Sequence, residues 1–338
     1  MGTFMSTEET ACDRPGPVLD ASAVNALDGG ADGESEEMEA EPDAHGAADV
    51  DSPPILRRSY HFEAAGRDIE YALFVPSQAM QMKRPLLVLL HGLFSTPHRV
   101  IRYPGVVTEA ERRGYLVVAP YGYNERGWYG SRALNDKFSK MCGSGKDPEN
   151  LPELSERDVL NVLDIVRRDY EVDDDRIYLA GHSMGGAGTI HIGASYPEIW
   201  AALALLSPAL KKLDVKILEH IKSKPVISIA GDKDKITRVG PMRNWVAAMK
   251  ELGMVHEYLE IEGMPQWQIV IRWSFGRMGA SRSCAARRFR APQQMRICEG
   301  GGHGTVCSSP ELIANVFDFF DDQNARRLAV STSAAPSA

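Results

Sequence analysis

The chain has 338 residues, of which 43% are hydrophobic and 25% are charged, as is ordinary for a soluble globular protein. It holds no run of about 18 uncharged apolar residues, so no membrane-spanning helix is expected. The net charge of −8 is unevenly placed, because residues 1–52 carry 14 acidic side chains and one basic one, which leaves +5 on the remaining 286. The acidity therefore belongs to a tail, and no nucleic-acid partner is expected.

Residues 1–54 are rich in Ala, Gly, Glu, Asp and Ser and are predicted to be a disordered acidic tail. They lack the basic start and apolar core of a signal peptide. Residues 1–6 fit the N-myristoylation pattern at Gly2, although a free terminus is the favoured alternative and one acyl chain would give no stable membrane anchor. The five cysteines are widely spaced and form no metal-ligand cluster, which favours a reducing compartment such as the cytoplasm.

Strands and helices alternate along most of the remaining chain. Strands are predicted at residues 58–62, 69–75, 86–90, 115–119, 176–180, 201–206, 225–230 and 255–261. Helices are predicted at residues 100–113, 155–170 with Ser155 as cap, 183–196, 213–221, 238–252 and 309–320. This order predicts an α/β fold with a mostly parallel sheet, helices on both faces and an N-terminal β-hairpin. The catalytic domain is expected to span residues 55–322, followed by a disordered C-terminal tail at 323–338.

A nucleophile motif lies at the boundary between a predicted buried strand and a predicted helix. Its residues are Gly181-His182-Ser183-Met184-Gly185. A serine at such a sharp turn needs small neighbours, and the start of the helix supplies N–H groups where negative charge develops. Ser183 is therefore predicted to be a catalytic nucleophile.

A serine hydroxyl needs a general base that is itself oriented by a carboxylate, and in nucleophile-elbow hydrolases the chain order is serine, acid, histidine. His256 and His303 both lie late enough, but His256 falls inside a predicted strand, which favours His303 in its glycine-rich loop. The acid should follow the strand at 225–230. Asp234, further into the loop, is the favoured acid. Asp232 is the alternative acid, although it would more naturally cap or brace the turn, and a plain solvated turn is the remaining alternative.

Two backbone N–H groups are expected to bind the oxyanion, those of Met184 and Leu93. Leu93 follows the predicted strand 86–90 and Gly92, which permits a sharp turn, while His91 is expected to hold this loop. Four aromatic residues in the long loop 120–152 either border the substrate pocket or pack within the loop: Tyr121, Tyr123, Trp128 and Tyr129.

These motifs together resemble the α/β-hydrolase superfamily, in the esterase and peptidase-like branch that includes feruloyl esterases and poly(hydroxyalkanoate) depolymerases. The matching segments are 90–92, 118–120, 127–130, 181–186, 231–234 and 302–304. The resemblance covers residues 58–320. It implies hydrolysis of an ester, or sometimes an amide, with no cofactor and no metal.

Residues 264–300 depart from the family pattern. They hold seven arginines, no lysine and one acid, and they separate the strand at 255–261 from His303. Three interpretations remain: a lid in which Trp267, Trp273 and Phe275 roof an apolar acyl pocket, a basic binding arm, or translated non-coding sequence. Because removal of this insertion restores the usual spacing, the last is favoured.

The predicted function is hydrolysis of a small-molecule carboxylic ester through an acyl-enzyme on the triad Ser183, Asp234 and His303. A peptidase of the same fold and a catalytically impaired binding protein are the alternatives. The acyl and alcohol groups, the oligomeric state and the role of the tail are not encoded in a recognisable motif.

Overall fold

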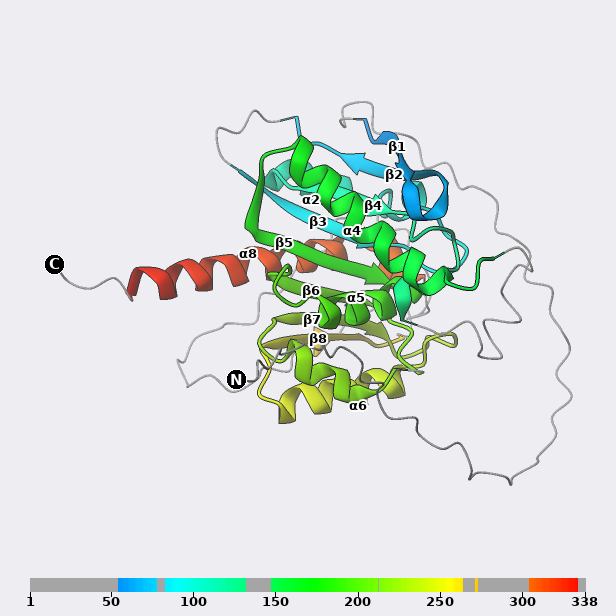
Figure 1. Cartoon of the computed structure of the whole chain (residues 1–338). Helices are drawn as coiled ribbons and strands as arrows, with labels where there is room; N and C mark the ends of the chain where they lie inside the picture. Colours follow the sequence, from blue (N-terminus) through cyan, green and yellow to red (C-terminus); the bar gives the residue numbers. More distant parts are fainter. Residues whose placement is uncertain are drawn as a thin grey trace, which may run out of the picture. The chain divides into compact units, whose positions relative to one another are not determined.

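The computed structural model describes residues 54–77, 83–131, 147–211, 213–263, 271–272 and 304–333. Within these ranges the strands form one sheet in the order β1-β2-β4-β3-β5-β6-β7-β8-β9 (Figure 1). The strands are β1 (Leu56–Phe62), β2 (Arg67–Phe74), β3 (Arg84–Leu90), β4 (Leu116–Pro120), β5 (Val172–His182), β6 (Ala202–Leu206), β7 (Val226–Gly231), β8 (His256–Ile261) and β9 (Ile271–Arg272).

The pairing of the strands confirms the predicted fold class. β1 and β2 form an antiparallel hairpin, β2 pairs antiparallel with β4, and β9 pairs antiparallel with β8. The six strands from β3 to β8 pair with one another in parallel. In such a sheet the carboxyl ends of the parallel strands share one edge, and ligands bind there.

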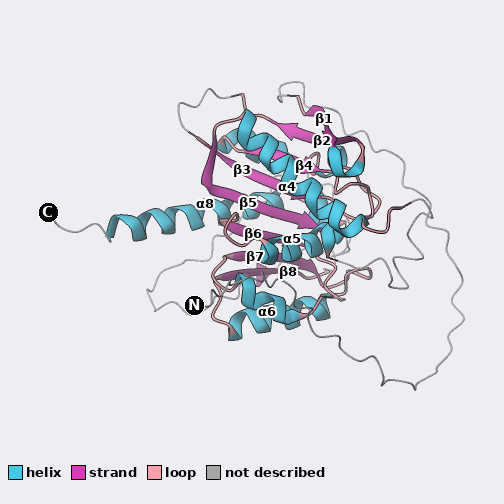
Figure 2. Cartoon of the chain, viewed as in Figure 1, coloured by secondary structure: helices cyan, strands magenta, loops and turns pink. Residues whose placement is uncertain are grey.

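Alternate residues of each central strand feed two separate cores, as the pleat requires. Leu86, Val88 and Leu90 of β3 lie in one core, and Leu87 and Leu89 lie in the other. Figures 1 and 2 show α4, α5 and α6 over one face of the sheet and α2 and α8 over the other. The helices are α1 (Pro97–Val100), α2 (Val106–Arg113), α4 (Leu151–Asp169), α5 (Met184–Ser195), α6 (Val239–Glu251), α7 (Thr305–Ser308) and α8 (Pro310–Ser333). Short 3₁₀ helices lie at η1 (Glu63–Ala65), η2 (Trp128–Gly130) and η3 (Val215–Ile221).

The helix predicted at 100–113 is instead two helices, α1 and α2. Gly105 separates them with a φ of 94°, and a Cβ at this glycine would lie 2.9 Å from the Cα of Pro310. The break therefore follows from the close approach of the first turn of α8, a contact more than 200 residues away along the chain.

The helix predicted at 155–170 begins earlier, at Leu151, with Pro152 in its first turn. Leu151 and Leu154 are buried and extend the apolar face of α4 beyond the predicted start. Ser155 is therefore not the cap that we predicted. It lies inside the helix and is completely buried.

The helix predicted to end near residue 320 continues to Ser333, so residues 323–333 are helical rather than part of a C-terminal tail. The side chain of Arg327 forms an ion pair with Asp175 at 2.6 Å, which ties the extension to the start of β5. The second half of α8 is mostly exposed and projects past the sheet (Figure 1). The predicted acidic tail 1–54 lies outside the described residues except for Pro54, and the insertion 264–300 does so except for β9.

Candidate active site

Ser183 lies at the turn between β5 and α5, with φ 55° and ψ −113°. A non-glycine residue in such a sparsely populated region costs about 1–3 kcal/mol and persists only where the surroundings enforce it. The backbone enforces it here. The N–H of Ser183 donates to the carbonyl of Leu206 at 2.9 Å, and its own carbonyl accepts from the N–H groups of Ala187 at 3.2 Å and Ala209 at 2.9 Å.

The glycines of the motif make room for this turn. A Cβ on Gly181 would overlap the carbonyl of Gly185, and a Cβ on Gly185 would overlap the carbonyl of Leu90. The first turn of α5 is thus pressed against the end of β3, which brings two parts of the predicted site together.

The loop after β3 lies directly against the nucleophile. A Cβ placed on Gly92 would be 3.4 Å from the Cβ of Ser183. The loop then turns, with the N–H of Ser95 donating to the carbonyl of Gly92 at 3.1 Å and the N–H of Phe94 donating to the carbonyl of Glu125 at 2.9 Å. The N–H of Leu93, which lies between Gly92 and Phe94 in the chain, forms no hydrogen bond with another described residue.

Met184 is the first residue of α5, so its N–H has no partner within the helix. The positive end of the helix dipole adds to the attraction for a negative charge at this point. Both N–H groups that the sequence predicts for the oxyanion therefore belong to backbone segments beside Ser183, which is 8% exposed.

Asp234 follows β7 and is buried, with only 4% of its surface exposed. One carboxylate oxygen accepts from the N–H groups of Ile236 at 2.9 Å and Thr237 at 2.8 Å. The other accepts from the hydroxyl of Thr237 at 2.5 Å. These bonds fix the carboxylate at the edge of the sheet where β5 ends at the nucleophile.

Asp232 takes a different position in the same turn. Its carboxylate accepts from the N–H of Gly263 at 2.5 Å, and its own N–H donates to the carbonyl of Ile261 at 3.0 Å. Asp232 thus braces the ends of β7 and β8 against each other, which is the role that the sequence favoured for it over that of the acid.

His303 lies outside the described residues, and the chain is described again from Gly304. The short helix α7 then places Cys307, which is buried, close to Asp234. Burial raises the pKa of the Cys307 thiol, and the negative charge of Asp234 raises it further. His256, the other late histidine, is buried in β8 with its Nδ1 3.0 Å from the carbonyl oxygen of Met254.

His91 is completely buried behind the oxyanion loop. Its Nδ1 lies 2.8 Å from the carbonyl oxygen of Gly92, and its Nε2 lies 2.9 Å from that of Tyr121. Burial lowers the pKa of His91, so the ring is neutral near pH 7 and donates its single N–H to one of these carbonyls at a time. His91 therefore joins two loops of the site, as the sequence predicted.

The aromatic residues predicted as substrate contacts mostly pack inside the protein. Tyr129 has no exposed surface, and its hydroxyl lies 3.0 Å from the backbone nitrogen of His91. Trp128 is buried as well, at 6% exposed. Tyr121 and Tyr123 are half-buried and pack against a small cluster formed by the hairpin and α4. The guanidinium of Arg67 also covers the Tyr123 ring, 4.1 Å from its centre.

Sequence reasoning missed three side chains that support the site. The hydroxyl of Tyr103 lies 3.0 Å from Nδ1 of His182, the residue before the nucleophile. Ser155 and Asp158 of α4 are completely buried and bind the loop after β4. A polar residue on the apolar face of a predicted helix is the signal that could have identified Asp158, since it stands four residues after Leu154 and one before Val159.

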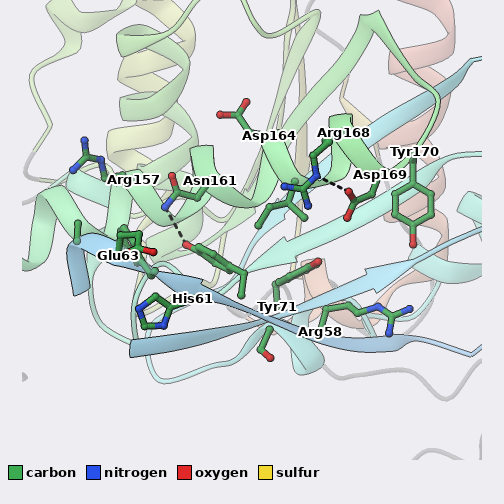
Figure 3. Close-up of a pocket in the computed structure, with 15 residues that line it drawn as sticks. Arg58, His61, Glu63, Tyr71, Arg157, Asn161, Asp164, Arg168, Asp169 and Tyr170 are labelled. Carbon is green, nitrogen blue, oxygen red and sulfur yellow. Dashed lines mark hydrogen bonds and ion pairs between the residues drawn. The ribbon is translucent and has the colours of Figure 1, made fainter. Parts of the chain in front are cut away.

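An open groove of about 880 Å³ lies away from these residues, between the β1–β2 hairpin and α4 (Figure 3). Charged and polar side chains line much of it, including the ion pair between Arg168 and Asp169. None of its lining residues belongs to the Ser183 turn, the Gly92 loop or the Asp234 turn. Binding sites for small organic molecules are usually apolar with a few convergent polar groups, so we assign no substrate to this groove.

Two further findings apply to the described part of the chain. Every helix there is too short or too polar to cross a membrane. No group of three or more His, Cys, Asp or Glu side chains there is arranged to hold a metal ion.

The family model described as "Putative esterase" matches residues 63–268, which is more than half of the chain. The chain belongs to this esterase family. The matched range includes Ser183, Asp234 and the loop at 91–93, and it ends close to the start of the insertion that precedes His303. The predicted relationship to the esterase branch of the α/β-hydrolases is therefore confirmed.

An S-formylglutathione hydrolase and a feruloyl esterase are similar to this chain over part of their length. S-formylglutathione hydrolase of Rattus norvegicus is 28% identical over 145 residues, which cover 41% of this chain and 51% of the relative. Feruloyl esterase B of Neurospora crassa is 26% identical over 140 residues, covering 41% and 44% respectively. The chain thus spans about half the length of these relatives.

Solved structures of esterases are similar as well. A thermostable esterase is 25% identical, with a TM-score of 0.48 over 62% of this chain and 54% of the other. A ferulic acid esterase of Anaeromyces mucronatus is 14% identical, with a TM-score of 0.49 over 66% and 89%.

Proposed function

We propose that this protein is a serine hydrolase that cleaves small carboxylic esters through an acyl-enzyme on Ser183, with Asp234 and His303 completing the triad. The observation that carries the proposal is the backbone of Ser183, held at positive φ between β5 and α5 with the Gly92 loop against it. Membership of the esterase family and the ester-hydrolysing relatives support the choice of an ester as substrate.

In the proposed first step, the Oγ of Ser183 attacks the ester carbonyl carbon while His303 accepts the proton of the Ser183 hydroxyl. The carbonyl oxygen becomes an oxyanion, which the N–H groups of Met184 and Leu93 bind. Asp234 stabilises the imidazolium of His303. The tetrahedral intermediate collapses as His303 returns its proton to the leaving alcohol, and the acyl group stays on Ser183.

In the second step a water molecule gives a proton to His303 and adds to the acyl-enzyme carbonyl. The same two N–H groups bind the second oxyanion. Collapse of this intermediate breaks the bond to Ser183, returns the proton to its Oγ and releases the carboxylic acid. The charge develops in both steps at the same oxygen, so fixed N–H donors serve both without rearrangement.

Labelling with a fluorophosphonate probe tests the nucleophile, and hydrolysis of short-chain p-nitrophenyl esters tests the reaction. The unchanged protein should be labelled and active, whereas Ser183→Ala should lose the label and at least about a thousandfold in kcat. Ser195→Ala is the matched control, because Ser195 is an exposed serine at the end of α5 and should behave as the unchanged protein.

Three results would contradict the proposal in different ways. Well-folded protein that takes no label and hydrolyses neither ester nor amide is a binding protein rather than an enzyme. Faster cleavage of peptide anilides than of p-nitrophenyl esters makes it a peptidase. Equal labelling of Ser183→Ala places the nucleophile elsewhere.

A further inference from the structure

Asp158 is a completely buried carboxylate on α4 that the proposed mechanism does not use. One of its oxygens accepts from the hydroxyl of Tyr60 in β1 at 2.7 Å. The other accepts from the N–H groups of Gly122 at 2.7 Å and Tyr123 at 3.3 Å, in the loop after β4. A buried charge is costly unless it is hydrogen-bonded, so these donors offset the cost of burying the carboxylate.

The peptide group between Tyr121 and Gly122 links this carboxylate to the oxyanion loop. Its N–H donates to Asp158, and its carbonyl lies 2.9 Å from Nε2 of His91. Hydrogen bonds in such a chain polarise one another. A negative charge at the N–H end makes the carbonyl at the other end a stronger acceptor, and this favours the form of His91 that carries its proton on Nε2.

A second connection runs from α4 to the same loop through Tyr129. Ser155, one turn before Asp158, accepts from the N–H of Tyr129 at 2.9 Å. The Tyr129 hydroxyl in turn lies 3.0 Å from the backbone nitrogen of His91 and 3.3 Å from its carbonyl oxygen. One face of α4 therefore holds His91 through its ring and through its backbone.

His91 precedes Gly92 and Leu93 directly, and Gly92 lies against the nucleophile. A shift of His91 would move the Leu93 N–H relative to the point where the oxyanion forms. A displacement of about 1 Å at a reacting centre can cost about a hundredfold in rate. The position of His91 should therefore affect the rate of the reaction, even though its ring is completely buried.

We propose that Asp158 is a positioning residue of the esterase site, which fixes the oxyanion-binding loop at Gly92 and Leu93 through the Tyr121–Gly122 peptide group and His91. The inference rests on the proposed function for its effect on the rate. Burial raises the pKa of Asp158 to about 6, against the opposing effect of its hydrogen bonds, so the carboxylate is ionised at pH 8.

Asp158→Asn and Asp158→Ala test the role in two steps. Asparagine keeps the size of the side chain and one acceptor oxygen for the loop but removes the charge, whereas alanine removes the acceptor. At pH 8 we expect kcat for p-nitrophenyl acetate to fall about tenfold in Asp158→Asn and about a hundredfold in Asp158→Ala, with KM within about threefold. Affinity for a trifluoromethyl ketone, which forms a tetrahedral oxyanion on the serine, should fall in parallel with kcat.

Two controls separate positioning from general stability. Tyr60→Phe removes the donor to the other oxygen of Asp158, so it should lower the urea midpoint of unfolding and leave kcat within about twofold. Asp164→Asn changes an exposed carboxylate of the same helix and should alter neither quantity. Amide hydrogen exchange adds a readout that needs no turnover: in Asp158→Asn the amides of Phe94 and Ser95 should exchange faster than in Tyr60→Phe.

The outcomes distinguish this inference from the proposed function. Equal kcat in both Asp158 variants and the unchanged protein overturns the positioning role, as does a loss in Tyr60→Phe that matches Asp158→Asn. Unchanged exchange at Phe94 and Ser95 overturns it as well. If the unchanged protein hydrolyses no ester while Asp158→Asn still loosens the loop, the proposed function fails and the link from Asp158 to the loop stands.

Discussion

Several turns in the described part of the chain hold non-glycine residues at positive φ, and two of them do so by different means. At the first, Ser183 has a φ of 55° and is held by backbone hydrogen bonds to β6 and α5. At the second, the loop after β4, three residues have such angles: Tyr123, Trp128 and Tyr129, with φ values of 68°, 57° and 52°. Side chains of α4 hold this loop, through Ser155 and Asp158.

The difference shows which interactions offset the backbone strain at each of the two turns. At Ser183 the offset comes from close backbone packing, which requires that neighbouring residues have no side chains. In the loop after β4 it comes from buried polar groups that stand 26 and 36 residues further along the chain. The first arrangement tolerates no added atoms, and the second tolerates no lost acceptors. Removing an oxygen from a side chain of α4 should therefore loosen the loop after β4 and leave the Ser183 turn in place.

Gly185→Ala should have the largest effect on stability. The added Cβ would overlap the carbonyl of Leu90, and neither backbone segment can move without disturbing β3 or α5. We expect the free energy of unfolding to fall by about 4 kcal/mol or more, measured by urea denaturation with the soluble fraction on expression as a second readout.

Gly240→Ala is the matched control. Gly240 lies in the first turn of α6, where a Cβ would meet nothing within 4 Å, and alanine there should stabilise the protein by up to about 1 kcal/mol. If Gly185→Ala were as stable as Gly240→Ala, close backbone packing would not be what holds Ser183 at positive φ.

The contrast also explains what the sequence could predict. The nucleophile turn, the parallel strands and the bracing of Asp232 follow from local patterns, because glycines and apolar runs act on their immediate neighbours. The burial of Tyr129 and the break between α1 and α2 could not be predicted in this way. Each depends on a partner far along the chain, Gly188 of α5 in the first case and Pro310 in the second. Aromatic residues in a loop look alike in sequence whether they line a pocket or fill the core.

The second largest effect should be a dependence of the free energy of unfolding on pH, which reports the ionisation of Asp158. Its pKa in the folded protein, about 6, lies above the ordinary value of 3.8, so the folded state binds this proton more tightly than the unfolded state does. The resulting contribution to stability is fully present below about pH 4 and is lost as the pH rises through 6. It amounts to something on the order of 3 kcal/mol.

Urea denaturation of the unchanged protein and of Asp158→Asn at pH 4, 5, 6 and 7 measures this contribution. Asparagine has no such proton, so the variant should gain stability relative to the unchanged protein as the pH rises across this range. Asp164→Asn should give a curve parallel to that of the unchanged protein, since Asp164 is exposed. Parallel curves for Asp158→Asn would mean that burial of the carboxylate does not raise its pKa.

Ser155→Ala should have the smallest effect of the three, because it removes a single neutral acceptor. The N–H of Tyr129, now 2.9 Å from the Ser155 oxygen, would be left buried without a partner. An unsatisfied buried donor costs about 1–3 kcal/mol. The cost falls on the strained residue itself, so Tyr129 should relax from positive φ and release the backbone of His91. We therefore expect a lower Tm together with a lower kcat, whereas Ser195→Ala, which removes an exposed hydroxyl, should change neither. A loss of stability in Ser155→Ala with kcat intact would show that the ring of His91, held through the Tyr121–Gly122 peptide group, suffices to place the oxyanion loop.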